Sequence, residues 1–402
     1  MAIEIRSPSQ DELLAAMRAG EASFGDAPQE DDVERHRKTM PEDRFLAAYD
    51  NGRPIGTAAA FPFELTVPGG QVRAGGVTWV GVLPSHRRRG ILTQFMRYQF
   101  DDLHERGEPI AILFASESAI YGRFGYGIAA PSLAMGAERA RFSLRDDPGA
   151  TGAVSFLDAD EALEVLPGLY DRIRQEMPGM FARTREWWTE NKLADPERWR
   201  RGAGPKFFAV HEHDARPEGY AIYRVKNEWQ NGIPQSQLRV LEAFGTSAAA
   251  TREVWRFLFG IDLVARVESH LFDPGSPLPL MVRDMRSLHL TVVDGLWLRL
   301  VDVEAALRVR SYAPGDTIVI EVGDALCPWN SGRYRVGESF ERTDDAPDLE
   351  LDVADLASAY LGAFDFHALA RAQRVTERTA GALARASALF RTERPPFCPE
   401  IF

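Results

Sequence analysis

Apolar and polar positions along the first 143 residues alternate in a pattern that predicts strands and helices in turn. Two apolar stretches flank Asn51-Gly52, a pair that tolerates the positive φ angles of a tight hairpin turn. Gly107 follows an amphipathic stretch and is placed to end a helix in the left-handed conformation. The predicted elements, in order, are a helix around residues 13–17, strands over 45–49, 55–63 and 76–82, a helix over 91–106, a strand over 110–115 and a short helix that reaches Tyr121.

A similar order of helix, hairpin, long strand, helix and strand returns in residues 146–288. The order indicates an internal duplication, although order alone also repeats by chance in α+β proteins. The predicted elements are a strand over 154–157, helices over 161–175 and 183–193, strands over 207–211, 219–225 and 237–244, a helix over 248–259 and a strand over 263–268.

The last 113 residues, 290–402, form a third pattern of strands and helices that ends in a proline-rich tail. Three prolines after Arg394 remove backbone donors and hold the tail extended, so we expect no helix there. No low-complexity linker separates the three regions. We therefore expect an α+β protein, layered in the α/β manner, with packed domains at 1–145, 146–289 and 290–402.

Composition and charge narrow the class of protein. Hydrophobic residues make up 45% and charged residues 26% of the 402 positions, which is typical of a folded soluble chain and excludes a disordered one. The net charge of −12 disfavours binding to nucleic acid or an anionic membrane and suits a cationic substrate. The two cysteines lack zinc-site spacing, and His211 with His213 lacks a third ligand, so we expect no metal. Nowhere do 18 apolar residues stand together, and we expect a cytoplasmic protein.

The strongest candidate for chemistry is the basic turn Arg87-Arg88-Arg89-Gly90 between a strand and a helix. A helix N-terminus presents unpaired backbone N–H groups, and these favour a phosphate or pyrophosphate. Arginines on the approach add charge complementarity. The alternative is a solvated basic turn with no ligand.

This turn resembles motif A of the GCN5-related N-acetyltransferases (GNATs), with Arg87-x-x-Gly90-x-Leu92 in place of R/Q-x-x-G-x-G/A. Leu92 departs from the usual small residue. The second half of the family pattern is similar to Tyr121-x-x-x-Gly125-Tyr126. Landmarks over nearly the whole chain, the last of them a C-terminal Phe402, resemble the Eis (enhanced intracellular survival) acetyltransferases of actinobacteria. They are His86 to Gly90, Ala115 to Glu117, Tyr121 to Gly127, Tyr220 to Val225 and Asp294 to Arg299.

The resemblance implies two tandem GNAT-like domains, the second degenerate, then a sterol-carrier-like domain, assembled as a homohexamer. It also implies that acetyl-CoA is the cosubstrate. The residues that it places around acetyl-CoA are Val80, Gly81 and Val82 for pantetheine, Arg88, Arg89, Gly90, Ile91, Leu92 and Thr93 for the pyrophosphate, and Ser116 and Glu117 near the thioester. The second region has no Arg-x-x-Gly after its long strand, and we expect no CoA there.

Amine acetylation needs a base for the ammonium and an acid for the leaving thiolate. The resemblance assigns the acid to Tyr121 and the base to the C-terminal carboxylate of Phe402. That carboxylate, with a pKa of ~3.5, is ionised at neutral pH. The alternatives are a core tyrosine and a frayed terminus, although the apolar ending favours docking.

The resemblance places Phe24, Asp26, His36 and Glu400 around the amine substrate, although helix capping is an alternative for the acidic residues near Asp26. We therefore expect an acyltransferase that acetylates a polycationic small molecule such as an aminoglycoside, at one or more positions, by direct attack in a ternary complex. Two alternatives stay open. They are a protein-lysine acetyltransferase and a non-catalytic sensor that binds CoA or lipid.

Overall fold

The computed structural model describes residues 3–145, 149–337 and 340–402, which fall into two compact units. The first unit consists of Met1–Ala130, Leu296–Glu393 and Ile401–Phe402, and the second of Pro131–Gly295 and Arg394–Glu400. The C-terminal tail is thus divided between the units. The expected domain limits at 145/146 and 289/290 stay predictions. The first of them adjoins residues 146–148, which lie outside the described residues.

The first unit contains a mixed sheet in the strand order β1-β2-β3-β4-β5-β14. Its turn between β2 and β3 has Asn51 at φ 52° and Gly52 at φ 75°, which confirms the predicted tight hairpin. Strand β4 starts at Gly70, earlier than expected, because it pairs along nearly its whole length with β3. The strands are β1 (Glu4–Arg6), β2 (Phe45–Asp50), β3 (Arg53–Val67), β4 (Gly70–Val82), β5 (Ile110–Phe114) and β14 (Thr291–Leu300).

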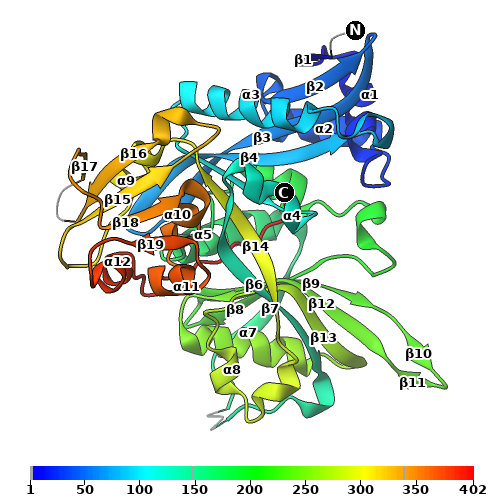
Figure 1. The fold of residues 1–402 in the computed structure, drawn as a ribbon. Coiled ribbons are helices and arrows are strands. Elements are labelled where there is room, and N and C mark those ends of the chain that lie inside the picture. The colour runs from blue at the N-terminus through cyan, green and yellow to red at the C-terminus, as the bar shows by residue number, and fades with distance from the viewer. Residues whose placement is uncertain (1–2, 146–148, 338–339) are drawn as a thin grey trace. The chain divides into compact units, whose positions relative to one another are not determined.

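Helices α1 (Leu13–Glu21), α2 (Glu30–Thr39), α3 (Ile91–Glu105) and α4 (Ser118–Tyr121) belong to this unit. Helix α1 lies very close to the long β3–β4 hairpin (Figure 1). A Cβ added at Gly20 would lie 1.9 Å from the Thr57 hydroxyl, so only glycine permits this approach. Gly107 ends α3 at φ 68°, as predicted.

Residues 303–393 form a second layer of the first unit around a five-stranded sheet in the order β17-β16-β15-β18-β19. Sequence patterning places Leu296–Leu300 in this region, but the structure pairs them with Ile110–Phe114 of β5. The elements are α9 (Val303–Val309), β15 (Ile318–Gly323), β16 (Gly332–Val336), β17 (Glu341–Arg342), β18 (Leu349–Asp352), α10 (Val353–Tyr360), α11 (Phe366–Arg371), β19 (Val375–Glu377) and α12 (Ala382–Leu389).

The second unit repeats the order seen in the first. Its sheet runs β6-β13-β12-β9-β8-β7, and β12 and β13 are parallel neighbours, as β4 and β5 are. A short β10–β11 hairpin extends from it. The elements are β6 (Gly127–Glu138), β7 (Ala153–Leu157), α5 (Ala159–Arg174), α6 (Arg185–Trp187), β8 (Phe207–His213), β9 (Arg216–Lys226), β10 (Trp229–Gln230), β11 (Ile233–Pro234), β12 (Ser236–Gly245), α7 (Ala248–Gly260), β13 (Val264–Phe272) and α8 (Leu278–Met281).

Side chains of alternate residues in the second unit's strands pack into two separate hydrophobic cores. Leu238 and Val240 of β12 pack with α7 residues such as Trp255. On the other side, Phe208 of β8 packs with α5 and with Phe397 of the tail. The tail residues Arg394–Phe402 contain no helix or strand, as their prolines predict.

Candidate active site

A cleft of about 580 Å³ in the first unit opens where β4 and β5 separate. The two strands pair in parallel only from Ala74 to Gly76 of β4. Further along, β4 has a bulge at which the pairing with β3 shifts between Thr57 and Ala59, and Trp79 takes φ 49°. Val80, Gly81 and Val82 beyond the bulge line the cleft, so β4 offers a strand edge to an extended ligand.

The basic turn closes one end of the cleft, at the N-terminus of α3. Gly90, the N-cap of α3, is left-handed at φ 78°, and Arg88 also takes a positive φ of 64°. A Cβ placed at Gly90 meets no atom within 4 Å, so the space in front of the turn is open. The first residues of a helix have backbone N–H groups without intrahelical partners, and Ile91, Leu92 and Thr93 line the cleft. These residues fit the pyrophosphate of acetyl-CoA.

Arg89 is the expected cofactor residue that the structure does not place among the residues lining this cleft. Its guanidinium lies 4.0 Å from the Asp50 carboxylate and 3.4 Å from the Ser85 carbonyl. Sequence reasoning missed several lining residues. Arg87, the first residue of the recognised motif, lines the cleft as the basic turn predicts, and His86 adjoins the motif, but Ser23 gives no local signal because α1 brings it to the cleft. The missed lining residues are Ser23, His86, Ile120 and Arg123.

Tyr121 lies in the wall of the cleft with Ser116 and Glu117. It is the last residue of α4 and is buried, with its ring 5.7 Å from that of Tyr126. Burial, together with the negative charge of Glu117, raises the pKa of Tyr121 to about 12. Its hydroxyl is therefore protonated throughout the neutral range and available as a donor.

The C-terminal residue packs at the end of β5 that precedes Ser116. The Phe402 ring makes edge contacts with Phe114, the last residue of β5, and with Phe63 of β3, at centroid distances of 5.9 and 5.1 Å. Phe402 is only partly exposed. The terminus is thus docked within the first unit.

The expected substrate residues near α2 have different surroundings. Phe24 lines the cleft, and Asp26 is exposed, with its carboxylate accepting a hydrogen bond from the Ala27 N–H at 2.7 Å. Burial and the charges of Asp26 and Asp32 raise the pKa of Glu21. The alternative of helix capping is correct for Asp32, which forms a capping box with Gln29.

His36 is buried and does not line the cleft. Its ring packs at 4.2 Å from Trp79, the bulge residue of β4, and at 5.3 Å from Phe45. Burial, with a smaller contribution from Arg37, lowers the pKa of His36 to about 3, so the imidazole is uncharged at neutral pH. The structure therefore gives His36 a supporting position behind the β4 bulge.

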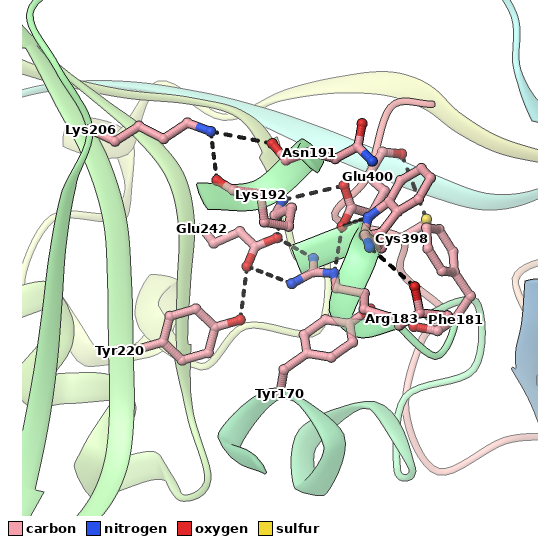
Figure 2. Close-up of polar contacts among 12 residues, drawn as sticks. Tyr170, Phe181, Arg183, Asn191, Lys192, Lys206, Tyr220, Glu242, Cys398 and Glu400 are labelled. Atoms are coloured by element: carbon pink, nitrogen blue, oxygen red, sulfur yellow. Dashed lines mark hydrogen bonds and ion pairs between the residues drawn. The ribbon is translucent and has the colours of Figure 1, made fainter. Parts of the chain in front are cut away.

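Glu400 is buried in the second unit, and its carboxylate is already used. It forms ion pairs with Arg183 Nε at 2.5 Å and with Lys192 Nζ at 3.3 Å (Figure 2). Trp187 Nε1 also donates a hydrogen bond to it at 3.3 Å. The prediction of an acidic group facing an amine pocket does not match this arrangement, because the carboxylate has protein cations as partners.

Family comparisons agree with this geometry. Residues 4–129 match a GNAT acetyltransferase domain, residues 179–309 a second GNAT acetyltransferase domain, and residues 303–399 a sterol carrier protein domain. The expected duplication and the expected fold class are thereby confirmed. The chain is an acyltransferase of the GNAT class, whose members use acetyl-CoA.

Relatives define the family more narrowly. An uncharacterized N-acetyltransferase of Streptomyces avermitilis is 40% identical, and the match covers 94% of this chain and 95% of the relative. N-acetyltransferase Eis of Mycobacterium tuberculosis is 34% identical, with 98% of each chain covered. The crystal structure of Eis1 from Mycobacterium abscessus superposes with a TM-score of 0.87 at 35% identity, over the full length of both chains. The chain belongs to the Eis family of N-acetyltransferases. No helix within the described residues is long and apolar enough to cross a membrane.

Proposed function

We propose that this N-acetyltransferase acetylates amines of a polycationic small molecule, of the aminoglycoside kind, at one or more positions. The observation that carries the proposal is one cleft whose lining combines the edge of β4, the basic turn at the N-terminus of α3 and Tyr121. Glu21 and Asp26 do not line the cleft, but each lies two residues along the chain from a lining residue, Ser23 or Phe24, and their carboxylates supply negative charge near it for a polycation.

The cleft would hold acetyl-CoA by its main chain. The edge of β4 at Val80–Val82 faces the amide groups of pantetheine, and the N-terminal turn of α3 faces the pyrophosphate. Ser116 and Glu117 then lie near the acetyl group. Because the acyl donor and the amine share one cleft, the amine attacks directly in a ternary complex.

The C-terminal carboxylate of Phe402 is the proposed proton acceptor. Its packing against Phe114 holds the terminus at the end of β5, two residues before Ser116. A carboxylate with a pKa of ~3.5 is ionised at neutral pH and takes the ammonium proton directly or through a water molecule. The amine is then neutral when it attacks.

Tyr121 is the proposed donor to the leaving thiolate. Its pKa of about 12 lies well above that of a thiol, ~8.5, so complete proton transfer is opposed by roughly 5 kcal/mol. We infer that the main contribution of Tyr121 is a hydrogen bond to the sulfur as negative charge develops there. Such a bond strengthens in the transition state and raises kcat rather than binding.

The experiment that tests this function is thiol release from acetyl-CoA in the presence of aminoglycosides, polyamines or lysine peptides. Amine-dependent release with the small polycations, and none with the peptides, is the expected result. Release with peptides alone replaces the proposed substrate class by protein lysines. If acetyl-CoA binds but no amine triggers release, the protein is a sensor.

The assembly that we propose is a homohexamer in the cytoplasm, which rests on the family resemblance. Light scattering of the purified protein measures the molar mass directly. A mass of one or two chains at micromolar concentration would contradict the hexamer without affecting the proposed chemistry.

A further inference from the structure

The second unit contains its own strand separation, in the same place in the fold as the cleft of the first. Strands β12 and β13 pair in parallel from Ser236 to Val240 and then part. A small cleft of about 60 Å³ opens there, lined by Glu242 and Phe244 on β12 and by Phe272 on β13. It corresponds to the space that would hold acetyl-CoA in the first unit.

Local structure in the second unit leaves no phosphate cradle. The N-terminus of α7 is capped by Ser247, whose hydroxyl accepts a hydrogen bond from the Ala250 N–H at 3.1 Å. A Cβ at Gly245 would lie 2.3 Å from the Thr251 nitrogen, so β12 and α7 are in close contact. The open left-handed turn formed by Gly90 in the first unit has no counterpart here.

The C-terminal tail occupies part of this second cleft. Arg394, Phe397 and Pro399 are among its lining residues. The Phe397 N–H donates to the Pro178 carbonyl at 2.9 Å, and the Phe397 ring packs against that of Phe244 at 6.4 Å. Phe397 and Cys398 are each 2% exposed, so their side chains are as deeply buried as those of the hydrophobic core.

Glu400 ends the buried stretch in a cluster of ion pairs. The carboxylates of Glu242 and Glu400 share Arg183 and Lys192, and Figure 2 shows both acids facing these two cations. The Tyr220 hydroxyl also donates to Glu242 at 2.8 Å. Burial opposes the charge on Glu242, but Arg183 and Lys192 hold its pKa at about 2. Loss of Glu400 would leave two cations with one carboxylate.

We propose that the second GNAT-like unit is a receptor for the chain's own C-terminal tail, and that Glu400 is a positioning residue for the terminal carboxylate. Phe402 is two residues beyond Glu400, so an extended chain limits its distance from the anchor to about 7 Å. The claim about the carboxylate rests on the proposed function, whereas the claim about the receptor does not.

Glu400→Ala tests the anchor, and Glu393→Ala is the matched control, since Glu393 is exposed seven residues earlier in the chain. Lys192→Met tests the receptor side with a milder change, because the Lys192 side chain is 12% exposed. Three quantities are measured for each folded variant. They are the rate at which carboxypeptidase removes Phe402, followed by intact mass, the dissociation constant of acetyl-CoA, and kcat for the best amine.

Glu400→Ala and Lys192→Met should speed removal of Phe402 at least about tenfold and lower kcat on the order of 100-fold, with acetyl-CoA affinity unchanged. Glu393→Ala should match the wild type in all three. Removal of Phe402 at the wild-type rate in both variants would overturn the receptor proposal. Rapid removal in variants with wild-type kcat would support the receptor and overturn the role of Glu400 in positioning a base, because the proposed base itself would then be wrong.

Discussion

Replacement of Gly81 by alanine should disturb the acyl-donor cleft through the packing of α1. An added Cβ would lie 2.4 Å from the Gly20 carbonyl oxygen and 2.5 Å from the Ser23 hydroxyl. The Ser23 hydroxyl already donates to that carbonyl at 2.7 Å, so both atoms are held in place. The end of α1 must therefore retreat by roughly 1 Å to reach an ordinary contact.

Two effects of opposite sign decide the magnitude. Overpacking of this kind costs about 1–3 kcal/mol, and removal of a glycine from a strand returns about 0.5–1 kcal/mol through the unfolded chain. The contact is with a backbone oxygen rather than a flexible side chain, so the clash wins. We expect a net loss of about 1–2 kcal/mol of unfolding free energy.

Thermal unfolding and acetyl-CoA titration of Gly81→Ala measure both consequences. The melting temperature should fall by several degrees, and acetyl-CoA should bind more weakly because Ser23 and Phe24 line the cleft. Gly168→Ala is the matched control. Gly168 lies in α5 with no atom within 4 Å of an added Cβ, so this variant should gain about 0.5–1 kcal/mol. Unchanged melting and unchanged affinity in Gly81→Ala would refute the close packing of α1 on β4.

Three further predictions concern the chemistry and its support. Tyr121→Phe should lower kcat by about 10²–10³ with KM unchanged, because the hydrogen bond to sulfur forms in the transition state; equal effects on acetyl-CoA binding would point to a packing role. A glycine added after Phe402 moves the terminal carboxylate by one residue and should abolish most turnover in steady-state assays, whereas full turnover would remove that carboxylate from the mechanism. His36 has a folded pKa of about 3 against ~6.5 unfolded, so its contribution to stability is present above pH 6.5 and is lost as the pH falls, by about 2 kcal/mol at pH 5. Denaturant unfolding of His36→Phe should lack this part of the pH dependence.

Features that depend on local backbone preference were predictable from sequence. The turn at Asn51-Gly52 and the helix end at Gly107 follow from the positive φ that these residues accept. Gly90 follows from the strand–turn–helix pattern, whereas Tyr121 is singled out through the resemblance to the family motif, and both line the cleft. The order along the chain of most strands and helices of each unit follows from the periodicity of apolar positions.

Features that depend on distant contacts were not predictable. Leu296 pairs with Phe114 across a long sequence separation, and no local pattern indicates that partner. His36 sits on a polar helix, and only the approach of Trp79 from β4 makes its site buried. Glutamate is usually found on the surface, but Glu400 is buried because it forms ion pairs with Arg183 and Lys192, which lie far from it in the sequence.

Because the chain is synthesised from its N-terminus, the buried tail affects how the second unit folds during translation. Residues 131–295 leave the ribosome well before Phe397 and Glu400, so the second unit first folds without one wall of its core and with Arg183 and Lys192 facing Glu242 alone. Its core and its cluster of ion pairs are completed only when the last residues have been made. A truncated chain thus keeps an exposed apolar groove that quality-control machinery recognises, and a finished chain hides it.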